Sequence, residues 1–209
     1  DIIAYSNSKQ YSLRNWDSSW NIYPWIPEIG LLTNLTCLEI KYSHIGYFPK
    51  EIIFMTNLIS LHLWQAGIKE LPSEICLMTN LTNMSFNENE IRMIPSEIKY
   101  LTNLSCINLC HNKLESLPLE FFDLINLKDL YLNWNLLEFI PNIRKLTKLE
   151  GLGLTGNKFK FPTYLNLEFL PNLNGISVDD DIVELLPMYL QNIIIPNLVP
   201  CRDNTQSVY

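Results

Sequence analysis

One 23-residue stretch, residues 78–100, returns along the chain with the same pattern of apolar positions. Its copies begin at Leu32, Met55, Met78, Leu101, Leu124, Leu146 and Leu170, so the spacings are 23, 23, 23, 23, 22 and 24 residues. A fixed apolar skeleton with a period in this range is typical of a solenoid, in which each coil packs against its neighbours. This repeat constrains the fold more strongly than any local propensity.

The repeated unit reads L-x-x-L-x-L-x-x-N-x-I-x-x-L-P-x-E-I-x-x-L. Its positions in the central copy are Leu81, Met84, Phe86, Asn89, Ile91, Ile94, Pro95, Glu97 and Ile98. The unit resembles the leucine-rich repeat family, and its Leu-Pro-x-Glu-Ile half resembles the intracellular 23-residue subclass found in scaffold proteins. The resemblance covers most of the chain. It implies an α/β solenoid with a curved parallel sheet on the concave face and short helical turns on the convex face.

Each part of the unit also has a physical role. Met84 and Phe86 alternate with polar residues, so they point to one side of a short strand. Such a strand cannot bury its apolar face alone, and stacking in parallel about 4.8 Å apart creates a continuous core. Pro95 fixes its own φ angle and is expected to start a short helical turn, with Glu97 near its positive end.

Asn89 falls where the chain turns out of the strand, and its side chain is expected to bond the backbone of neighbouring turns. The same position in successive copies is occupied by Asn21, Ser43, Ala66, Asn89, Asn112, Asn135, Asn157 and Asp181. Alanine has no polar side-chain atom. The pattern therefore predicts a weak point, or a bound water, at Ala66.

The length of 209 residues and the hydrophobic content of 47% favour one elongated domain. We expect a degenerate N-terminal repeat and cap over residues 1–31, the repeats over 32–187, and a C-terminal cap with a loose tail over 188–209. The terminal coils of a solenoid need such covers. A linker into a further domain is the alternative for the tail.

Charge and hydropathy disfavour two classes of partner. The net charge of −7 lacks the clustered basic surface that nucleic acid requires. No uncharged apolar run reaches 18 residues, so neither a membrane span nor a membrane partner is expected. The chain begins at Asp1 without a basic leader, so we expect a fragment or a processed form, in which any signal peptide is invisible.

The five cysteines do not form an evident disulfide framework. Cys37 and Cys106 occupy the same repeat position three coils apart, roughly 14 Å at strand spacing. Cys106 and Cys110 are about 13 Å apart along one strand, and neither separation can be bridged. Cys76 falls on the convex side, and Cys201 is not placed. Free thiols indicate a reducing, cytoplasmic location, with a secreted effector as the alternative.

The repeat leaves one face of each strand free to vary, and aromatic residues, histidines and carboxylates gather there. The predicted partner-binding residues are Trp20, Tyr42, His44, His62, Trp64, Glu88, Glu90, His111, Tyr131 and Trp134. They form two aromatic lobes with a polar, partly acidic saddle between them. Exposed Trp and Tyr typically anchor interfaces. In the alternative interpretation, Trp64 and Trp134 fold over neighbouring strands and only stiffen the sheet.

No pattern favours catalysis or metal binding. His44 and His62 fall on neighbouring strands, but no carboxylate–histidine arrangement recurs at ligand spacing. The acidic run 179–181 lacks an EF-hand loop, so a solvated rim is the expectation. Gly151-x-Gly153 lacks the following helix pattern of a phosphate loop. The sequence therefore predicts no cofactor, no metal and no enzyme activity.

The leading hypothesis is a non-catalytic module that clamps a protein partner on the concave face, with a basic segment of the partner meeting Glu88 and Glu90. Two alternatives stay open. One is a substrate-recognition arm of a larger enzyme or effector, such as a ubiquitin ligase or a GTPase-containing scaffold. The other is a structural subunit of a large assembly. The sequence does not predict an oligomeric state.

Overall fold

The structure is a computed structural model of the 209-residue chain. It describes residues 10–13, 27–42, 45–140, 143–159, 167, 170–196 and 198, with the backbone alone for 10–13 and 27. Trp20, Asn21, Ser43, His44 and Cys201 lie outside the described residues, so the predictions made for them stay predictions.

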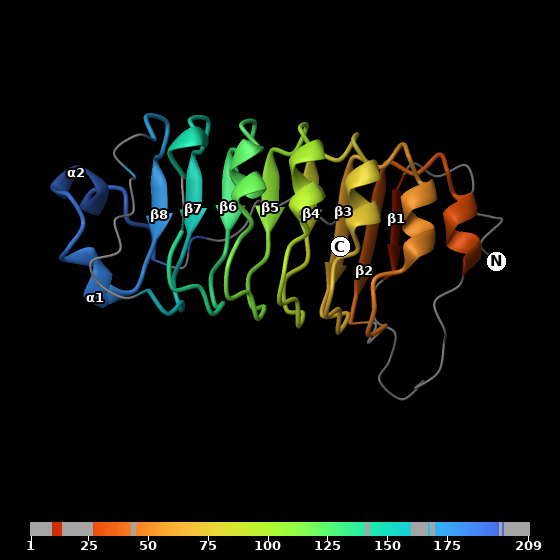
Figure 1. Ribbon diagram of the computed structural model, residues 1–209, viewed down its shortest axis with the longest axis horizontal. Helices are drawn as coiled ribbons and strands as arrows, with labels where there is room; N and C mark the ends of the chain where they lie inside the picture. Colours follow the sequence, from red (N-terminus) through yellow and green to blue (C-terminus); the bar gives the residue numbers. More distant parts are fainter. Residues whose placement is uncertain are drawn as a thin grey trace, which may run out of the picture.

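Within the described residues, one parallel sheet of eight strands runs in chain order along the molecule (Figure 1). The strands are β1 (Gln10–Leu13), β2 (Cys37–Lys41), β3 (Ser60–Trp64), β4 (Asn83–Ser85), β5 (Cys106–Asn108), β6 (Asp129–Tyr131), β7 (Gly151–Gly153) and β8 (Gly175–Ser177). Their register follows the repeat, because Cys37 pairs with Ser60, Ser60 with Asn83 and Asn83 with Cys106. The predicted solenoid is confirmed.

Short 3-10 helices pack against one face of the sheet (Figure 1). They are η2 (Pro27–Leu31), η3 (Lys50–Phe54), η4 (Ser73–Leu77), η5 (Ser96–Tyr100), η6 (Leu119–Asp123) and η7 (Ile143–Lys145). The helix η5 begins directly after Pro95, whose φ of −66° suits the start of a helical turn. Each turn is tight, as the bonds from Ile98 N to Pro95 O and from Leu101 N to Ile98 O show.

The hydrophobic core fills the space between the sheet and the 3-10 helices. It forms one contiguous cluster that reaches from Ile29 to Leu190. Phe86, Phe121 and Phe122 are among its largest fully buried side chains. Burial of each such side chain contributes about 1.5–3 kcal/mol relative to exposure. The core therefore fixes one face of every strand and leaves the opposite face, here called the concave face, free of packing demands.

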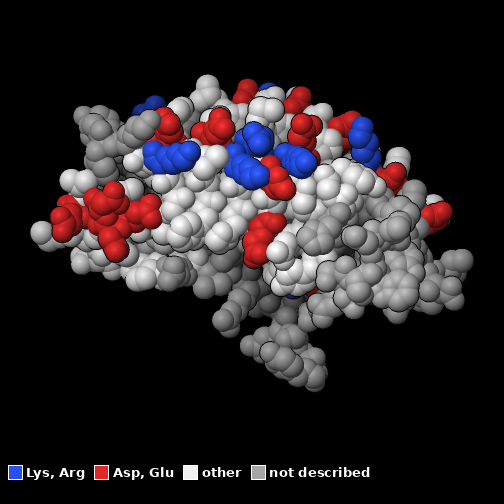
Figure 2. Space-filling view, turned by 90° about the horizontal axis from the view of Figure 1, so that it is seen from below, with Lys and Arg blue, Asp and Glu red and all other residues white. Residues whose placement is uncertain are grey.

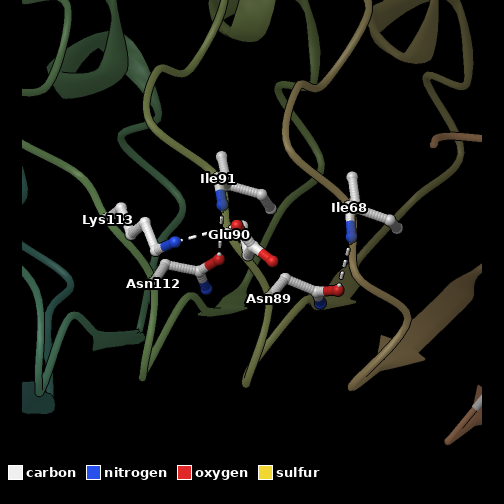
Figure 3. A network of polar contacts seen from close by, with 6 residues as sticks. All are labelled: Ile68, Asn89, Glu90, Ile91, Asn112 and Lys113. Carbon is white, nitrogen blue, oxygen red and sulfur yellow. Dashed lines mark hydrogen bonds and ion pairs between the residues drawn. The ribbon is translucent and has the colours of Figure 1, made fainter. Parts of the chain in front are cut away.

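Asparagines join successive coils as predicted (Figure 3). Asn89 accepts the N–H of Ile68 at 3.0 Å through Oδ1, and its Nδ2 donates to the carbonyls of Leu63 and Phe86. Asn112 repeats this arrangement one coil later and accepts the N–H of Ile91 at 3.0 Å. Both side chains are buried, so each satisfies backbone groups that would otherwise be stranded in the core.

Ala66 interrupts this asparagine column. There the backbone N–H of Gly46 donates to the Ala66 carbonyl at 2.8 Å. Gly46 and Gly67 both have positive φ angles, a conformation that glycine adopts without a steric penalty. This backbone hydrogen bond joins the two successive coils, which elsewhere are joined by the asparagine side chain.

The last coil differs from the prediction at the asparagine column. Asp181, expected in the asparagine column, lies exposed in the helix α1 (Asp180–Val183). Asp179 makes a different bond to the preceding coil, because its Oδ1 accepts the N–H of Gly156 at 2.8 Å. The assignment of Asp181 was wrong, because the helix begins one residue before it and leaves its side chain exposed.

Beyond the helix α2 (Met188–Gln191), the chain pairs with the last strand. Ile176 of β8 donates its N–H to Ile193 and accepts the N–H of Ile195 at 2.8 Å. The described chain thus covers the outer edge of β8. No helix in the described part of the chain combines the length and apolar character that a membrane crossing requires.

Candidate binding face

The concave face is built from outward-pointing residues at equivalent strand positions. One such row runs through Glu39, His62, Ser85, Asn108, Tyr131, Gly153 and Ser177, one residue from each of the strands β2 to β8. Side chains in this row are large and polar at the N-terminal end and small at the C-terminal end. The two halves of the face therefore differ, although they share one backbone geometry.

Trp64 dominates the N-terminal half of the concave face. Its indole Nε1 donates a hydrogen bond to the hydroxyl of Ser85 on β4. Lys41 on β2 places its Nζ 3.8 Å from the centre of the indole ring, and this lysine also pairs with Glu39 at 2.5 Å. Trp64 thus lies across neighbouring strands, as the alternative interpretation expected, while remaining only partly buried.

His62 contacts the same tryptophan. The two rings meet edge to face, with centroids 6.2 Å apart. The side chain of His62 is buried, so it supports Trp64 and presents almost no surface of its own. Its predicted role as an exposed partner contact does not agree with this position.

In five consecutive coils, the residue before the asparagine-column position forms an edge of the concave face, here called the αL rim. Its members are Tyr42, Gln65, Glu88, His111 and Trp134, with φ angles of 58°, 49°, 56°, 53° and 57°. This left-handed conformation costs residues with a side chain about 1–2 kcal/mol. Four of the five are among the predicted partner-binding residues. Gln65 and the shared conformation were not predicted, although the position recurs with the period of the repeat.

Trp134 and His111 are neighbours on the αL rim. Their rings are stacked at 5.8 Å with planes only 11° apart. The indole also lies against Gly156, where an added Cβ would stand 2.4 Å from Cε3. Trp134 keeps 52% of its surface exposed in spite of these contacts, and Tyr42 keeps 49%. Both remain available to a partner.

The predicted acidic saddle is electrostatically mixed. Glu90 accepts a hydrogen bond from Lys113 Nζ at 2.8 Å (Figure 3), and this bond and the charge of Lys113 lower the pKa of the carboxyl. Lys69 and Arg92 act on it in the same direction. Figure 2 views this edge from below and shows basic side chains grouped among acidic ones. Glu88 is exposed and forms no ion pair with a described residue.

The C-terminal half of the face is closed. Tyr131 is only 4% exposed and packs in a cluster with Cys106, Cys110 and Leu198. Its hydroxyl donates to Asp129 at 3.1 Å, and burial raises the pKa of the phenol. Burial also raises the pKa of the Cys110 thiol to about 11. The prediction that Tyr131 forms part of an exposed aromatic lobe was wrong, because residues distant in sequence cover it.

Asn133 completes the closed half. Its Oδ1 accepts the N–H of Thr155 at 2.9 Å and the hydroxyl of Ser177 at 3.0 Å. The side chain lies over Gly153, where a Cβ would stand 2.4 Å from Nδ2. Gly153 must therefore lack a side chain, because the buried side chain of Asn133 occupies that space. The side chain of Asn133 fills the concave face at this point.

The cysteines differ from the prediction at one position. Cys106 is disulfide-bonded, while Cys37, Cys76 and Cys110 form no disulfide. The expectation of free thiols throughout was wrong, and the argument for a reducing compartment loses its basis. In the described part of the chain, no three His, Cys, Asp or Glu side chains are grouped in a way that suits a metal ion.

Comparisons with known proteins agree with this architecture. The family model for leucine-rich repeats matches residues 102–159. A leucine-rich repeat protein from Leptospira interrogans superposes with a TM-score of 0.72 and 26% identity over 94% of this chain. Residues 102–159 are thus leucine-rich repeats, and the chain has the fold of a leucine-rich repeat protein. Members of this family serve in general as protein-interaction modules and are typically non-catalytic.

An internalin from Listeria monocytogenes shares the fold, with a TM-score of 0.56 and 20% identity over 75% of this chain. The chain spans 57% of the Leptospira protein and 52% of the internalin, little more than half of each. No curated protein matches in sequence.

Proposed function

We propose that the chain is a non-catalytic module that binds a protein partner on the N-terminal half of its concave face and along the αL rim. The observation that carries this proposal is the rim itself. Five consecutive coils hold a residue with a side chain in the left-handed conformation, where glycine would be free of strain. Strained backbone of this kind clusters at functional sites.

The rim and the sheet supply what an interface needs. Tyr42 and Trp134 offer exposed rings, and Trp64 offers one edge of an indole that Lys41 and Ser85 hold in place. Large aromatic side chains with restricted motion bind with a small loss of entropy. Glu88 remains as an exposed carboxylate, so we extend the proposal to a partner with a basic residue at that point.

Substitution on the rim tests the proposal. Proteins captured from the native source by the wild-type chain are compared with those captured by Trp134→Ala, Trp64→Ala and Phe139→Ala. Phe139 is 54% exposed and lies on the loop between β6 and η7, so it is a matched control for Trp134. We expect the same partner to lose affinity for both tryptophan variants by about 2 kcal/mol, measured by calorimetry with purified proteins. Equal affinity for all four chains would remove this function.

A second candidate function rests on the convex side. The last residues of four consecutive 3-10 helices are exposed and apolar, namely Leu31, Phe54, Leu77 and Tyr100. The row ends at Asp123 and Lys145, which form an ion pair at 2.7 Å. Such a ridge suits a structural subunit of a larger assembly. Cross-links to a partner found only on this ridge, and lost in Leu77→Glu, would favour this role.

The place of the chain in a larger protein belongs to the same proposal. A recognition arm of a multidomain enzyme or effector agrees with a chain that spans about half of its structural relatives. The division of the chain into an N-terminal repeat and cap (1–31), the repeats (32–187) and a C-terminal cap and tail (188–209) stays a prediction. The intracellular subclass of the repeat also stays a prediction. The intact mass of the native protein tests the idea of an arm. The disulfide at Cys106 favours an oxidising compartment over the cytoplasm.

A further inference from the structure

One edge of the solenoid, at the N-terminal ends of the strands, carries a repeated Thr-Asn pair. The pair directly follows the first apolar residue of its coil, in the copies Thr33-Asn34, Thr56-Asn57, Thr79-Asn80 and Thr102-Asn103. All of these residues are exposed. The edge comes before the strands and the αL rim comes after them, so the two surfaces lie at opposite ends of the strands.

The asparagines of this edge are held in one orientation by the backbone. Each Nδ2 donates to the threonine carbonyl one coil earlier, at 2.9 Å from Asn57, 2.8 Å from Asn80 and 2.8 Å from Asn103. Among the described residues, no donor bonds the Oδ1 atom of any of these three side chains. The edge therefore presents a row of fixed hydrogen-bond acceptors, one from each coil.

The row keeps the spacing of the sheet. Backbone hydrogen bonds between coils continue from the strands into the edge, since Thr82 N–H donates to Ile59 at 2.8 Å and Ser105 N–H donates to Thr82 at 2.8 Å. Strands joined in this way are about 4.8 Å apart. Successive acceptors of the row therefore follow one another at about the same distance.

A groove of about 660 Å³ runs along this row. It is lined by Asn34 and the three asparagines of the acceptor row, together with Thr36, Ile59 and Thr82. None of these lining residues carries a charge. Such a groove offers an ionic ligand no counter-charge, and it suits a neutral ligand with many hydrogen-bond donors.

One coil beyond the groove, the chain itself supplies a donor to the same acceptor position. Asn126 Nδ2 donates to the Thr102 carbonyl at 2.8 Å, as its counterparts do, but Asn126 Oδ1 accepts a hydrogen bond from Lys148 Nζ at 2.7 Å. Lys128, at the position of Ile59 in this coil, pairs with Glu150 at 3.0 Å. The amide oxygens of this edge thus face outward and accept donors, and the groove leaves three of them open to a ligand.

We propose that this groove binds a neutral, extended glycan whose hydroxyl groups donate to Asn57, Asn80 and Asn103. One ring of an extended 1,4-linked glycan advances by a distance close to one coil, and each ring carries hydroxyl groups. An extended peptide matches the row less well, because its N–H groups on one side recur every two residues, about 6.5 Å against about 4.8 Å for the coils. The site is separate from the concave face, so this inference does not depend on the proposed function.

Calorimetric titration of the chain with cellohexaose and with N-acetylchitohexaose tests the site. We expect the wild-type chain to bind at least one of them, and Asn57→Ala/Asn80→Ala to bind it about tenfold more weakly, because two acceptors are lost. Asn172→Ala is the matched control and should keep the wild-type affinity. Its Nδ2 makes the same bond, to the Thr147 carbonyl at 2.7 Å, but Asn172 does not line the groove.

A second variant fills the groove without removing an asparagine. Ile59 is 45% exposed, and Ile59→Lys places an ammonium group beside the row, as Lys128 does two coils beyond Thr82. We expect about tenfold weaker glycan binding, since the ammonium competes for the acceptors. If urea denaturation shows that the double asparagine variant has lost its fold, Ile59→Lys decides: weaker binding supports the site, and unchanged binding overturns it.

Three results would overturn the proposal. The first is an absence of binding by the wild-type chain to both oligosaccharides. The second is equal affinity of the wild-type chain and a folded Asn57→Ala/Asn80→Ala variant. The third is binding of a neutral peptide of alternating threonine and glycine in place of the glycans, which would assign the groove to a protein ligand.

Discussion

The two halves of the concave face share one repeat but end in different surfaces. In the N-terminal half, Trp64 lies partly exposed between Lys41 and Ser85. In the C-terminal half, the glycines of β7 and β8 allow Tyr131, Asn133 and Leu198 to settle onto the sheet. Because outward-pointing residues contribute little to the core, a solenoid can open or close this face without changing its coils.

The same comparison extends to the turns. An unbroken run of buried asparagines, Asn89, Asn112 and Asn135, begins after β4 and continues into the C-terminal half, each bonded to the backbone of neighbouring coils. In the N-terminal half, Ala66 interrupts the run and two glycines with positive φ close the turn. The N-terminal half is the open half of the face. We expect hydrogen bonds between coils to stabilise it less than the C-terminal half.

Loss of an asparagine from the braced half should have the largest effect. In Asn112→Ala, the N–H of Ile91 loses its acceptor inside the core, and the carbonyls of Phe86 and Leu109 each lose one of two side-chain donors. We expect a decrease of about 3 kcal/mol in the free energy of unfolding, measured by urea denaturation. Asn80→Ala is the control, because its exposed side chain bonds only the Thr56 carbonyl. Equal losses in the two variants would show that burial of the asparagine is not what matters.

Substitution of Gly153, in the closed half, should have the second-largest effect on stability. Gly153→Val drives a branched side chain into Asn133, which two further hydrogen bonds hold in place. We expect about 2–3 kcal/mol of destabilisation in urea denaturation. The control Ser60→Val, at another outward-pointing position in the N-terminal half, should change stability by less than about 0.5 kcal/mol. A matching loss at Ser60 would erase the distinction between the halves.

A substitution in the open half should weaken partner binding by about 2 kcal/mol more than a substitution in the closed half. Trp64→Ala removes a partly exposed ring from the open half, while Tyr131→Phe changes a buried residue of the closed half. With the partner identified as above, calorimetry should show weaker binding for Trp64→Ala by about 2 kcal/mol and unchanged binding for Tyr131→Phe. Weaker binding by Tyr131→Phe would indicate that the closed half opens for the partner.

Alkaline pH should weaken the fold to a smaller extent. Burial raises the pKa of the Cys110 thiol from 9.0 to about 11, and burial, with the charge of Glu97, raises that of Cys76 to about 12. A raised folded-state pKa means that this stability is complete below pH 9 and is lost as the pH rises toward 11–12. We expect the Tm to fall over this range, and to fall less in Cys110→Ala and in Cys76→Ala. Parallel Tm curves for all three chains would contradict the assignment.

The smallest effect should come from the exposed pair between Lys113 and Glu90. Its atoms lie 2.8 Å apart, but both side chains are nearly half exposed. Lys113→Ala should therefore change the free energy of unfolding by less than about 0.5 kcal/mol, as measured by urea denaturation. A loss above 1 kcal/mol would mean that this edge, like the buried asparagines, holds the coils together.

Local rules made much of the fold predictable. The repeat located every strand from β2 to β8, the proline-initiated helix η5 and the buried asparagines, because each depends on residues within one coil or the next. The αL rim followed the same period, although its conformation passed unnoticed. Asp181 was misassigned because the short helix α1 changes the direction of the chain at that point.

The sequence by itself thus determined the stack of coils, since a 23-residue period can bury its apolar positions only against copies of itself. Only the tertiary structure decided which concave residues stay exposed. Leu198 covers Tyr131, and Cys106 is bonded, through contacts between residues far apart in the chain. No periodic pattern encodes such contacts, because they depend on where the chain goes after the repeats have ended.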